Sequence, residues 1–154
     1  MYQSFKRISN VSVNHRNHRA AANVNRDSMR CSYIHGYSRT IELTFECDIL
    51  TNEGWVVDFG DLSFVKKFIH ENWDHSTVIA FDDPLKDEML AMEKLWLIKL
   101  FILPPQYPGS IEGNCKFLLE WINENAPDDW VRREARCVSV RIYEHSDNFA
   151  QYSI

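Results

Sequence analysis

The sequence has few of the features that place a protein outside the cell or in a membrane. Its four cysteines, Cys31, Cys47, Cys115 and Cys137, are scattered without a Cys-x-x-Cys pair and do not predict a disulfide framework. The first residues lack the apolar centre of a secretory signal, and no apolar run is long enough to span a bilayer. We therefore expect free thiols, no membrane partner and a cytoplasmic location.

Positive charge is also scarce over the chain as a whole. The formal net charge is −5 at pH 7, which argues against nucleic acid as a partner because phosphate contacts need a basic surface. Residues 6–39 are the exception, since they hold seven basic residues and a single acid. This segment either faces a small anionic substrate or is a solvated loop balanced by the acidic remainder of the chain.

Length and composition predict one domain of the α+β class over residues 1–154. The chain is 45% apolar and 13% aromatic, which is enough for a hydrophobic core. Alternating apolar residues from Ile41 to Cys47 indicate a half-buried strand, and Ser110 is a suitable cap for a helix with an apolar stripe. We expect strands near 4–14, 39–47, 55–59, 95–103 and 137–143, main helices over 62–73 and 110–126, and helical turns over 85–92. Residues 16–35 are polar and predict a long loop, which in a small domain is usually functional.

The stretch from Cys31 to Tyr37 is the first candidate site, because it places a thiol four residues ahead of the imidazole of His35. Cys31 lies in the arginine-rich segment, and cationic neighbours lower the pKa of a thiol and favour the reactive thiolate. The other cysteines are expected in the core, where cysteine is most often found. From the residues alone, a catalytic and a structural role for Cys31 are about equally supported.

Two further candidates carry carboxylates. Asp74 precedes His75, and a carboxylate beside an imidazole can fix its tautomer for general-base work, although such a pair also commonly closes a helix. Glu144, at the end of the last strand, could hold a guanidine-like edge of a heterocycle by two parallel hydrogen bonds, or it could be an ordinary surface residue.

Three histidines could supply zinc ligands. His15 follows the first predicted strand, and His18 and His35 lie in the polar loop. Zinc favours four ligands, but these spacings match no standard zinc finger, so His18 can equally be a solvated loop residue.

Six short motifs, in one order along the chain, carry a resemblance to a known family. They lie at 11–16, 31–37, 54–59, 73–75, 110–114 and 143–152. Val-Ser-Val-Asn-His15-Arg is similar to Phe-Ser-Ala-Ala-His-Arg, and Cys31-x-x-x-His35-Gly-Tyr37 resembles Cys-x-x-x-His-Gly-His, of the 6-pyruvoyltetrahydropterin synthase and 6-carboxytetrahydropterin synthase family. The resemblance implies the tunnelling (T-) fold: an antiparallel four-stranded sheet with two main helices packed on one face, which oligomerises into a barrel as a homotrimer or hexamer.

The resemblance also implies roles for the candidate residues. His15 and His35 correspond to zinc-binding histidines, and Cys31 corresponds to the catalytic cysteine. Asp74 and His75 correspond to the pair that assists this cysteine.

On the substrate side, Glu144 corresponds to the glutamate that anchors the pterin. Arg16, together with Arg19, Arg26 and Arg30, would suit the triphosphate of a dihydroneopterin-type substrate.

One departure from the family pattern concerns the metal site. The second histidine of His-Gly-His is Tyr37 here, so one of three zinc ligands is missing by direct alignment. Three accounts compete: His18 restores a three-histidine site, Tyr37 binds through its phenolate, or the site holds metal weakly or not at all.

The resemblance therefore implies a lyase of the 6-carboxytetrahydropterin synthase type. Such an enzyme would convert dihydroneopterin triphosphate by zinc-assisted proton transfer, in the synthesis of queuosine (a 7-deazaguanine) or of pterins. The alternative is a T-fold protein that binds a pterin or purine without a complete zinc site and without full chemistry.

Overall fold

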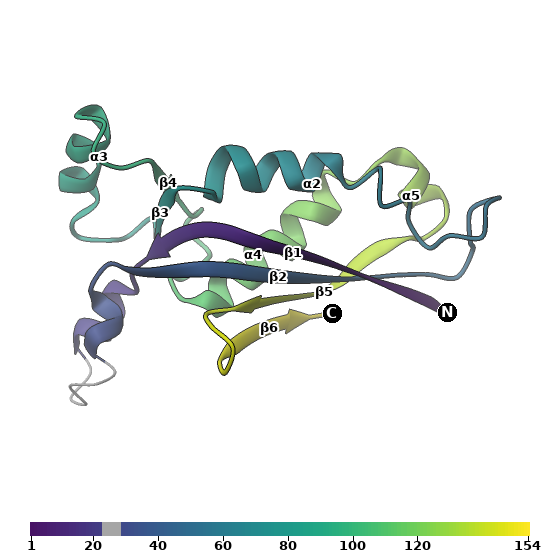
Figure 1. Ribbon diagram of the computed structural model, residues 1–154, viewed down its shortest axis with the longest axis horizontal. Coiled ribbons are helices and arrows are strands. Elements are labelled where there is room, and N and C mark those ends of the chain that lie inside the picture. Colours follow the sequence, from purple (N-terminus) through teal and green to yellow (C-terminus); the bar gives the residue numbers. More distant parts are fainter. Residues whose placement is uncertain (23–28) are drawn as a thin grey trace.

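The computed structural model describes residues 1–22 and 29–154 and contains a six-stranded mixed sheet (Figure 1). The strand order is β4-β3-β1-β2-β5-β6. Pairs β1–β2, β2–β5 and β5–β6 are antiparallel, whereas β1–β3 and β3–β4 are parallel. The strands are β1 (Tyr2–His15), β2 (His35–Cys47), β3 (Ser76–Ile79), β4 (Leu100–Ile102), β5 (Arg136–Tyr143) and β6 (Phe149–Ser153).

Helical segments connect the strands along the chain. The short 3₁₀ helices are η1 (His18–Ala22) and η2 (Arg30–Ser32), and a π-helix, η3 (Ile69–Trp73), continues directly from α2. The α-helices are α2 (Ser63–Phe68), α3 (Lys86–Lys94), α4 (Ile111–Glu124) and α5 (Asp128–Arg132). In Figure 1, α2 and α4 lie on the same side of the long β1–β2 pair, as predicted for the two main helices.

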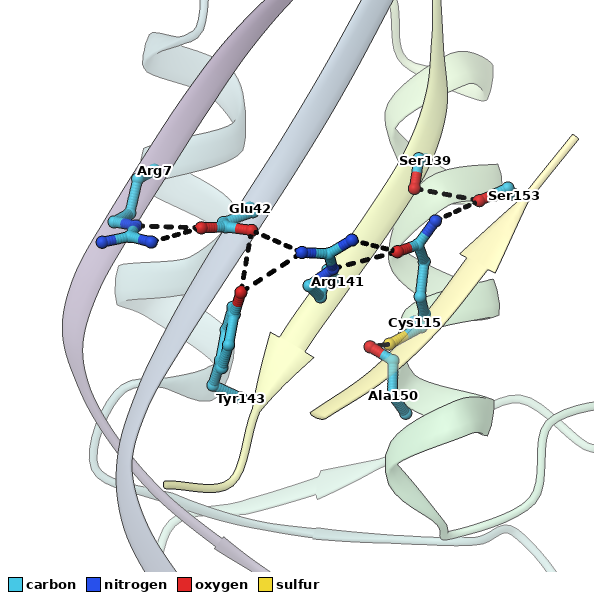
Figure 2. A network of polar contacts seen from close by, with 9 residues as sticks. Arg7, Glu42, Cys115, Ser139, Arg141, Tyr143, Ala150 and Ser153 are labelled. Atoms are coloured by element: carbon cyan, nitrogen blue, oxygen red, sulfur yellow. Dashed lines mark hydrogen bonds and ion pairs between the residues drawn. The ribbon is translucent and has the colours of Figure 1, made fainter. Parts of the chain in front are cut away.

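Alternation along β2 separates two different faces of the sheet. Ile41, Leu43 and Phe45 are completely buried under the helices, as their spacing predicts. Between them, Glu42 points to the opposite face, where Figure 2 shows it joined to Arg7 and to Tyr143 in a polar network that crosses four strands. The helix-covered face is therefore the core, and the other face is open and polar.

The predicted helix at Ser110 is confirmed in detail. The Ser110 hydroxyl accepts a hydrogen bond from the backbone N–H of Gly113 at 3.3 Å, which caps α4. The predicted stripe of Cys115, Leu118, Leu119 and Ile122 is buried. Aromatic rings join α4 to α2, with Phe68 and Trp121 centroids 4.1 Å apart.

The predicted four-stranded antiparallel sheet is wrong in strand number and in direction. Strands β1, β2, β5 and β6 do form an antiparallel set, but β3 and β4 add parallel pairings beside the end of β1. All four residues of β3 are buried, so this strand shows no alternation of polar and apolar residues from which it could be recognised. The exposed edge strand β6 alternates only between exposed and half-buried positions and was missed for lack of a hydrophobic signal.

Two predicted strands are also corrected. Residues 55–59 form turns and bends, not a strand. Within the apolar run 95–103, only Leu100–Ile102 are extended as β4, and Leu95, Trp96 and Leu97 are 69%, 95% and 67% exposed. Hydrophobicity alone does not separate a buried strand from an apolar surface turn, and here Trp96 turns the chain with a positive φ of 62°.

The polar segment 16–35 is less loop-like than predicted, because its described parts include η1, η2 and the first residue of β2. Arg26, one of the arginines considered for the triphosphate, lies outside the described residues. Within the described residues, no helix combines the length and the apolar character needed to cross a membrane.

Candidate active site

Strand pairing places two histidines side by side at one end of the sheet. His15 is the last residue of β1 and His35 is the first of β2, and the antiparallel register pairs them directly. Their ring centroids are 4.5 Å apart. Two segments that are separated by the whole 16–34 region therefore bring their imidazoles to one point.

Backbone carbonyls fix the tautomer of both rings. His15 Nδ1 lies 3.2 Å from the carbonyl oxygen of Gly109, and His35 Nδ1 lies 2.7 Å from that of Tyr33. A carbonyl only accepts, so each Nδ1 carries the hydrogen and each Nε2 keeps a free lone pair. This arrangement, in which the second ring nitrogen donates to a carbonyl, is typical of metal-binding histidines.

Gly109 can hold its carbonyl against His15 because it has no side chain. A Cβ at this position would lie 2.7 Å from the backbone oxygen of Arg16, closer than real Cβ contacts. The chain crossing beside the metal candidates therefore depends on a glycine.

Glu144 completes a group of three possible metal ligands. One ligand atom each from His15, His35 and Glu144 lie within 4.8 Å of one another. Two neutral imidazole nitrogens and one carboxylate oxygen are a donor set that suits zinc and other divalent transition metals. The residues present thus fit a metal ion.

Electrostatics keep His15 in its ligand form. Burial, and to a lesser extent the positive charge of Arg39, lowers the pKa of His15 to about 3. Arg39 is itself completely buried and donates from Nη1 to the side-chain oxygen of Asn114 at 3.1 Å. At neutral pH the His15 imidazole is therefore uncharged.

Tyr37, which stands where the family has a third histidine, also reaches this group. Its hydroxyl lies 3.3 Å from His15 Nε2. Burial raises the pKa of Tyr37 to about 12, against a smaller lowering by Arg39. The phenol is therefore protonated at neutral pH and can donate to His15.

His18 and Arg16, both predicted to serve the site, turn toward a pair of acids instead. Arg16 Nε lies 2.8 Å from a carboxylate oxygen of Asp83, whose side chain is fully buried. His18 Nε2 lies 3.8 Å from Asp82, and its Nδ1 lies 4.0 Å from Asp83. Arg19 also pairs with Asp82, at 3.0 Å. We call these five residues the aspartate clasp. Among the described residues, the clasp keeps His18 out of the group formed by His15, His35 and Glu144.

A cavity of about 430 Å³ opens beside the metal candidates, and we call it the His15 pocket. Cys31, which is exposed on η2, lines this pocket together with both histidines. The start of α4 forms another wall. The residues that line the His15 pocket include His15, Cys31, His35, Ser110, Glu112 and Glu144.

Asp74 and His75 contact each other, and His75 lines a different cavity. His75 Nδ1 is 3.0 Å from one Asp74 oxygen, and the backbone N–H of Ser12 donates to the other at 3.0 Å. Partial burial alone would raise the pKa of Asp74, but hydrogen bonds from His75 and Ser12 outweigh it and hold the pKa low. His75 lines a groove of about 500 Å³ with Tyr37 and Lys99, and we call it the His75 groove. One chain therefore brings Cys31 to the metal candidates but not to Asp74 and His75.

Sequence reasoning missed the groups that support the ligands. Gly109 and Tyr33 act through backbone carbonyls, which leave no side-chain signature. Asp83 gave a usable signal, because a pair of acids inside the apolar stretch 78–85 is unusual and suggests a buried partner.

Comparisons with known sequences identify the family. The family model described as 6-pyruvoyl tetrahydropterin synthase matches residues 9–154. A 6-carboxy-5,6,7,8-tetrahydropterin synthase from Aquifex aeolicus is 27% identical over 124 residues, which are 80% of this chain and 75% of the relative. The protein of the same name from Rickettsia conorii is 33% identical over 123 residues, which are 79% of this chain and 84% of the relative.

Solved structures share the fold. An uncharacterized protein from Wolinella succinogenes superimposes with a TM-score of 0.79 at 22% identity and covers 99% of this chain and 97% of its own. The 6-pyruvoyl tetrahydropterin synthase of Plasmodium falciparum gives 0.64 at 17% identity over the full length of both chains. These likenesses confirm the predicted T-fold type of architecture, and the named sequence relatives, which are lyases, confirm the prediction of an enzyme. On the match of its residues 9–154, the chain belongs to the 6-pyruvoyl tetrahydropterin synthase family.

Proposed function

We propose that this protein is a lyase of the 6-carboxytetrahydropterin synthase type, which converts dihydroneopterin triphosphate in queuosine or pterin biosynthesis. The observation that carries the proposal is the convergence of two tautomer-fixed imidazoles, a carboxylate and the Cys31 thiol on the His15 pocket. The names of the relatives from Aquifex aeolicus and Rickettsia conorii support the carboxy branch.

The metal of the proposed reaction is zinc, with His15 and His35 among its ligands. When bound, it would act as a Lewis acid on the oxygens of the substrate side chain. Cys31 lies in the same pocket and would move a proton at the adjacent side-chain carbon. By family resemblance, Glu144 contacts the pterin.

The proposed proton relay needs a second chain. Asp74 and His75 would serve Cys31, but in one chain His75 lines a separate cavity and neither residue lines the His15 pocket. A homo-oligomer in which the His75 groove of one subunit abuts the His15 pocket of its neighbour would bring the three groups together. This requirement supports the proposal of a trimer or hexamer, in which each chain acts as one functional domain.

Arg16 is the residue that we propose for the triphosphate of the substrate. Arg16 would meet phosphate only with its terminal guanidinium nitrogens, because its Nε is paired with Asp83.

All four cysteines are free thiols, which supports a reducing compartment such as the cytoplasm.

Turnover of dihydroneopterin triphosphate by the purified protein tests the proposal. With zinc added, we expect release of triphosphate, and Cys31→Ala should abolish it while the pterin still binds. No triphosphate release from the zinc-loaded wild-type protein would contradict the proposal.

A second candidate function is pterin or purine binding without turnover. Tyr37 in the place of a zinc-binding histidine is the observation that favours it. Tight pterin binding by a wild-type protein that neither holds zinc nor releases triphosphate would support this alternative.

A further inference from the structure

We propose that Glu144 is the third protein ligand of the metal site, so that the centre consists of two histidines and one carboxylate. This deepens the proposed function, because it concerns the same site, but it departs from the role that family resemblance gives Glu144. The missing histidine at position 37 is then replaced by a group from the other end of the chain.

Geometry favours Glu144 directly. Its carboxylate oxygen, with one nitrogen of His15 and one of His35, falls in a group no wider than 4.8 Å. Two ligands held about 2.0–2.2 Å from one zinc ion lie roughly 3–4 Å apart, so this group needs only a small contraction to close on an ion. Glu144 is half-buried, and its backbone N–H donates to the carbonyl of Asn148 at 3.0 Å, which anchors the start of the turn after β5.

His18 is the weaker candidate because the aspartate clasp holds it. Both of its ring nitrogens face carboxylates, at 3.8 Å from Asp82 and 4.0 Å from Asp83. Its side chain is only 13% exposed, so it is largely enclosed. To ligate a metal beside His15, it would have to leave both acids.

Tyr37 is near enough to compete, since its hydroxyl is 3.3 Å from His15 Nε2. However, a phenol must lose its proton before it becomes a good ligand, whereas the Glu144 carboxylate already carries the charge that the cation needs. We therefore assign Tyr37 the role of a hydrogen-bond donor at the edge of the site, and a variant that lacks only its hydroxyl tests this assignment.

Two consequences follow from a two-histidine, one-carboxylate site. Such a set accepts several divalent first-row metals, including zinc, cobalt and iron, and three protein ligands leave open positions for substrate. Glu144 also loses an oxygen for the heterocycle, so it cannot grip a pterin edge with two parallel hydrogen bonds and bind the metal at the same time.

The test is metal binding by the full-length protein without any substrate. Metal-stripped protein is titrated with Zn²⁺ against a chromophoric chelator and with Co²⁺, whose visible absorption reports the ligand set. The variants are Glu144→Gln, His18→Asn and Tyr37→Phe, and Glu112→Gln is the matched control because Glu112 is a carboxylate in the same pocket outside the group.

We expect about one zinc per wild-type chain and a loss of affinity in Glu144→Gln of about 100-fold or more, at or above the loss typical of outer-shell partners. His18→Asn and Glu112→Gln should bind like wild type, and Tyr37→Phe should bind zinc at least as tightly as wild type, because the Tyr37 hydroxyl competes with the metal for the Nε2 lone pair of His15. X-ray absorption of the wild-type zinc protein should show two imidazoles and not three, which tests the exclusion of His18 independently of how any variant folds.

Wild-type affinity in a folded Glu144→Gln, three imidazoles in the absorption spectrum, a loss in Tyr37→Phe as large as in Glu144→Gln, or no metal bound by wild type would each overturn the inference. Turnover is a separate readout. A protein that binds zinc through Glu144 but does not release triphosphate leaves the inference standing and removes the proposed function.

Discussion

His15 and His75 lie beside the same sheet, yet the protein builds them in opposite ways. His15 is 3% exposed and its ring hydrogen is held by a backbone carbonyl. The side chain of His75 is 79% exposed, and its ring nitrogen faces the carboxylate of Asp74. A buried imidazole beside a carbonyl stays neutral and offers a lone pair, whereas an exposed imidazole beside a carboxylate has the solvent access and the oriented partner that acid–base work requires. The partner of each ring therefore suits His15 to the ligand role and His75 to the acid–base role that we propose for them.

The backbone conformations of His15 and His75 also differ. His15 ends a long strand with ordinary ladder hydrogen bonds, whereas His75 has a positive φ of 60° directly before β3. Residues other than glycine rarely adopt this conformation, and it is concentrated at functional sites. The protein therefore holds one histidine by its strand and presents the other on a turn.

The largest expected effect separates the two histidines by metal content. His15→Asn should lose zinc and reduce turnover by about 1000-fold or more, because both the ligand and its Lewis acid are lost. His75→Asn should keep about one zinc per chain and lose turnover by about 100-fold or more through the missing acid–base group. Metal analysis and triphosphate release measure both. Equal loss of zinc in the two variants would contradict the division of roles.

A second prediction tests whether the two cavities meet between subunits. Cys31→Ala and Asp74→Asn should each be nearly inactive as pure proteins. When the two are co-expressed, some interfaces combine an intact His15 pocket with an intact His75 groove, so part of the activity should return. Mixtures that stay as inactive as the parents would show that the two cavities do not share one reaction.

The third prediction concerns pH. Because the pKa of His15 is lowered to about 3 in the folded chain, the unfolded chain binds this proton first as the pH falls below about 6.5. The free energy of unfolding of the metal-free protein should therefore decrease between pH 6.5 and 3, and the share due to His15 should be a few kcal/mol at most.

Denaturant unfolding at several pH values, with a chelator present, measures this dependence. The matched control is His15→Asn, which should be flatter than wild type over the same pH range. Parallel curves for the two proteins would mean that His15 is not held neutral by the fold.

The smallest effect is expected for the stability of His75→Asn. The side chain is largely exposed, and asparagine tolerates a positive φ better than most residues, so the free energy of unfolding should change by about 0.5 kcal/mol or less. Thermal or denaturant unfolding at neutral pH checks this. A loss of several kcal/mol would mean that His75 is a structural residue, contrary to the comparison with His15.

Local patterns predicted those parts of the molecule that local forces determine. The alternation from Ile41 to Cys47 and the cap at Ser110 needed only neighbouring residues, and both are confirmed. The four-stranded sheet was wrong because β3 is buried on both faces and β4 is three residues long, so neither gives a periodic signal.

The candidate site was harder to assemble from sequence for a similar reason. The motifs located His15, His35 and Glu144, but their approach to one another depends on strand register and on the turn after β5. The partners of His18 also come from a segment far along the chain, and no spacing within 15–35 indicates them.

The aspartate clasp limits how this chain can be shortened. The segment from Phe81 to Lys99 looks like a removable appendage, with α3 standing away from the body of the sheet in Figure 1. Yet its first residues include Asp82 and Asp83. Asp83 is the buried counter-charge of Arg16, and Arg16 directly follows His15 in the chain. Deleting the appendage would leave the enclosed guanidinium of Arg16 without its anion, directly beside the candidate metal ligand His15, and an unpaired buried charge strongly destabilises a protein. Trimming for crystallisation or engineering should therefore start after Pro84.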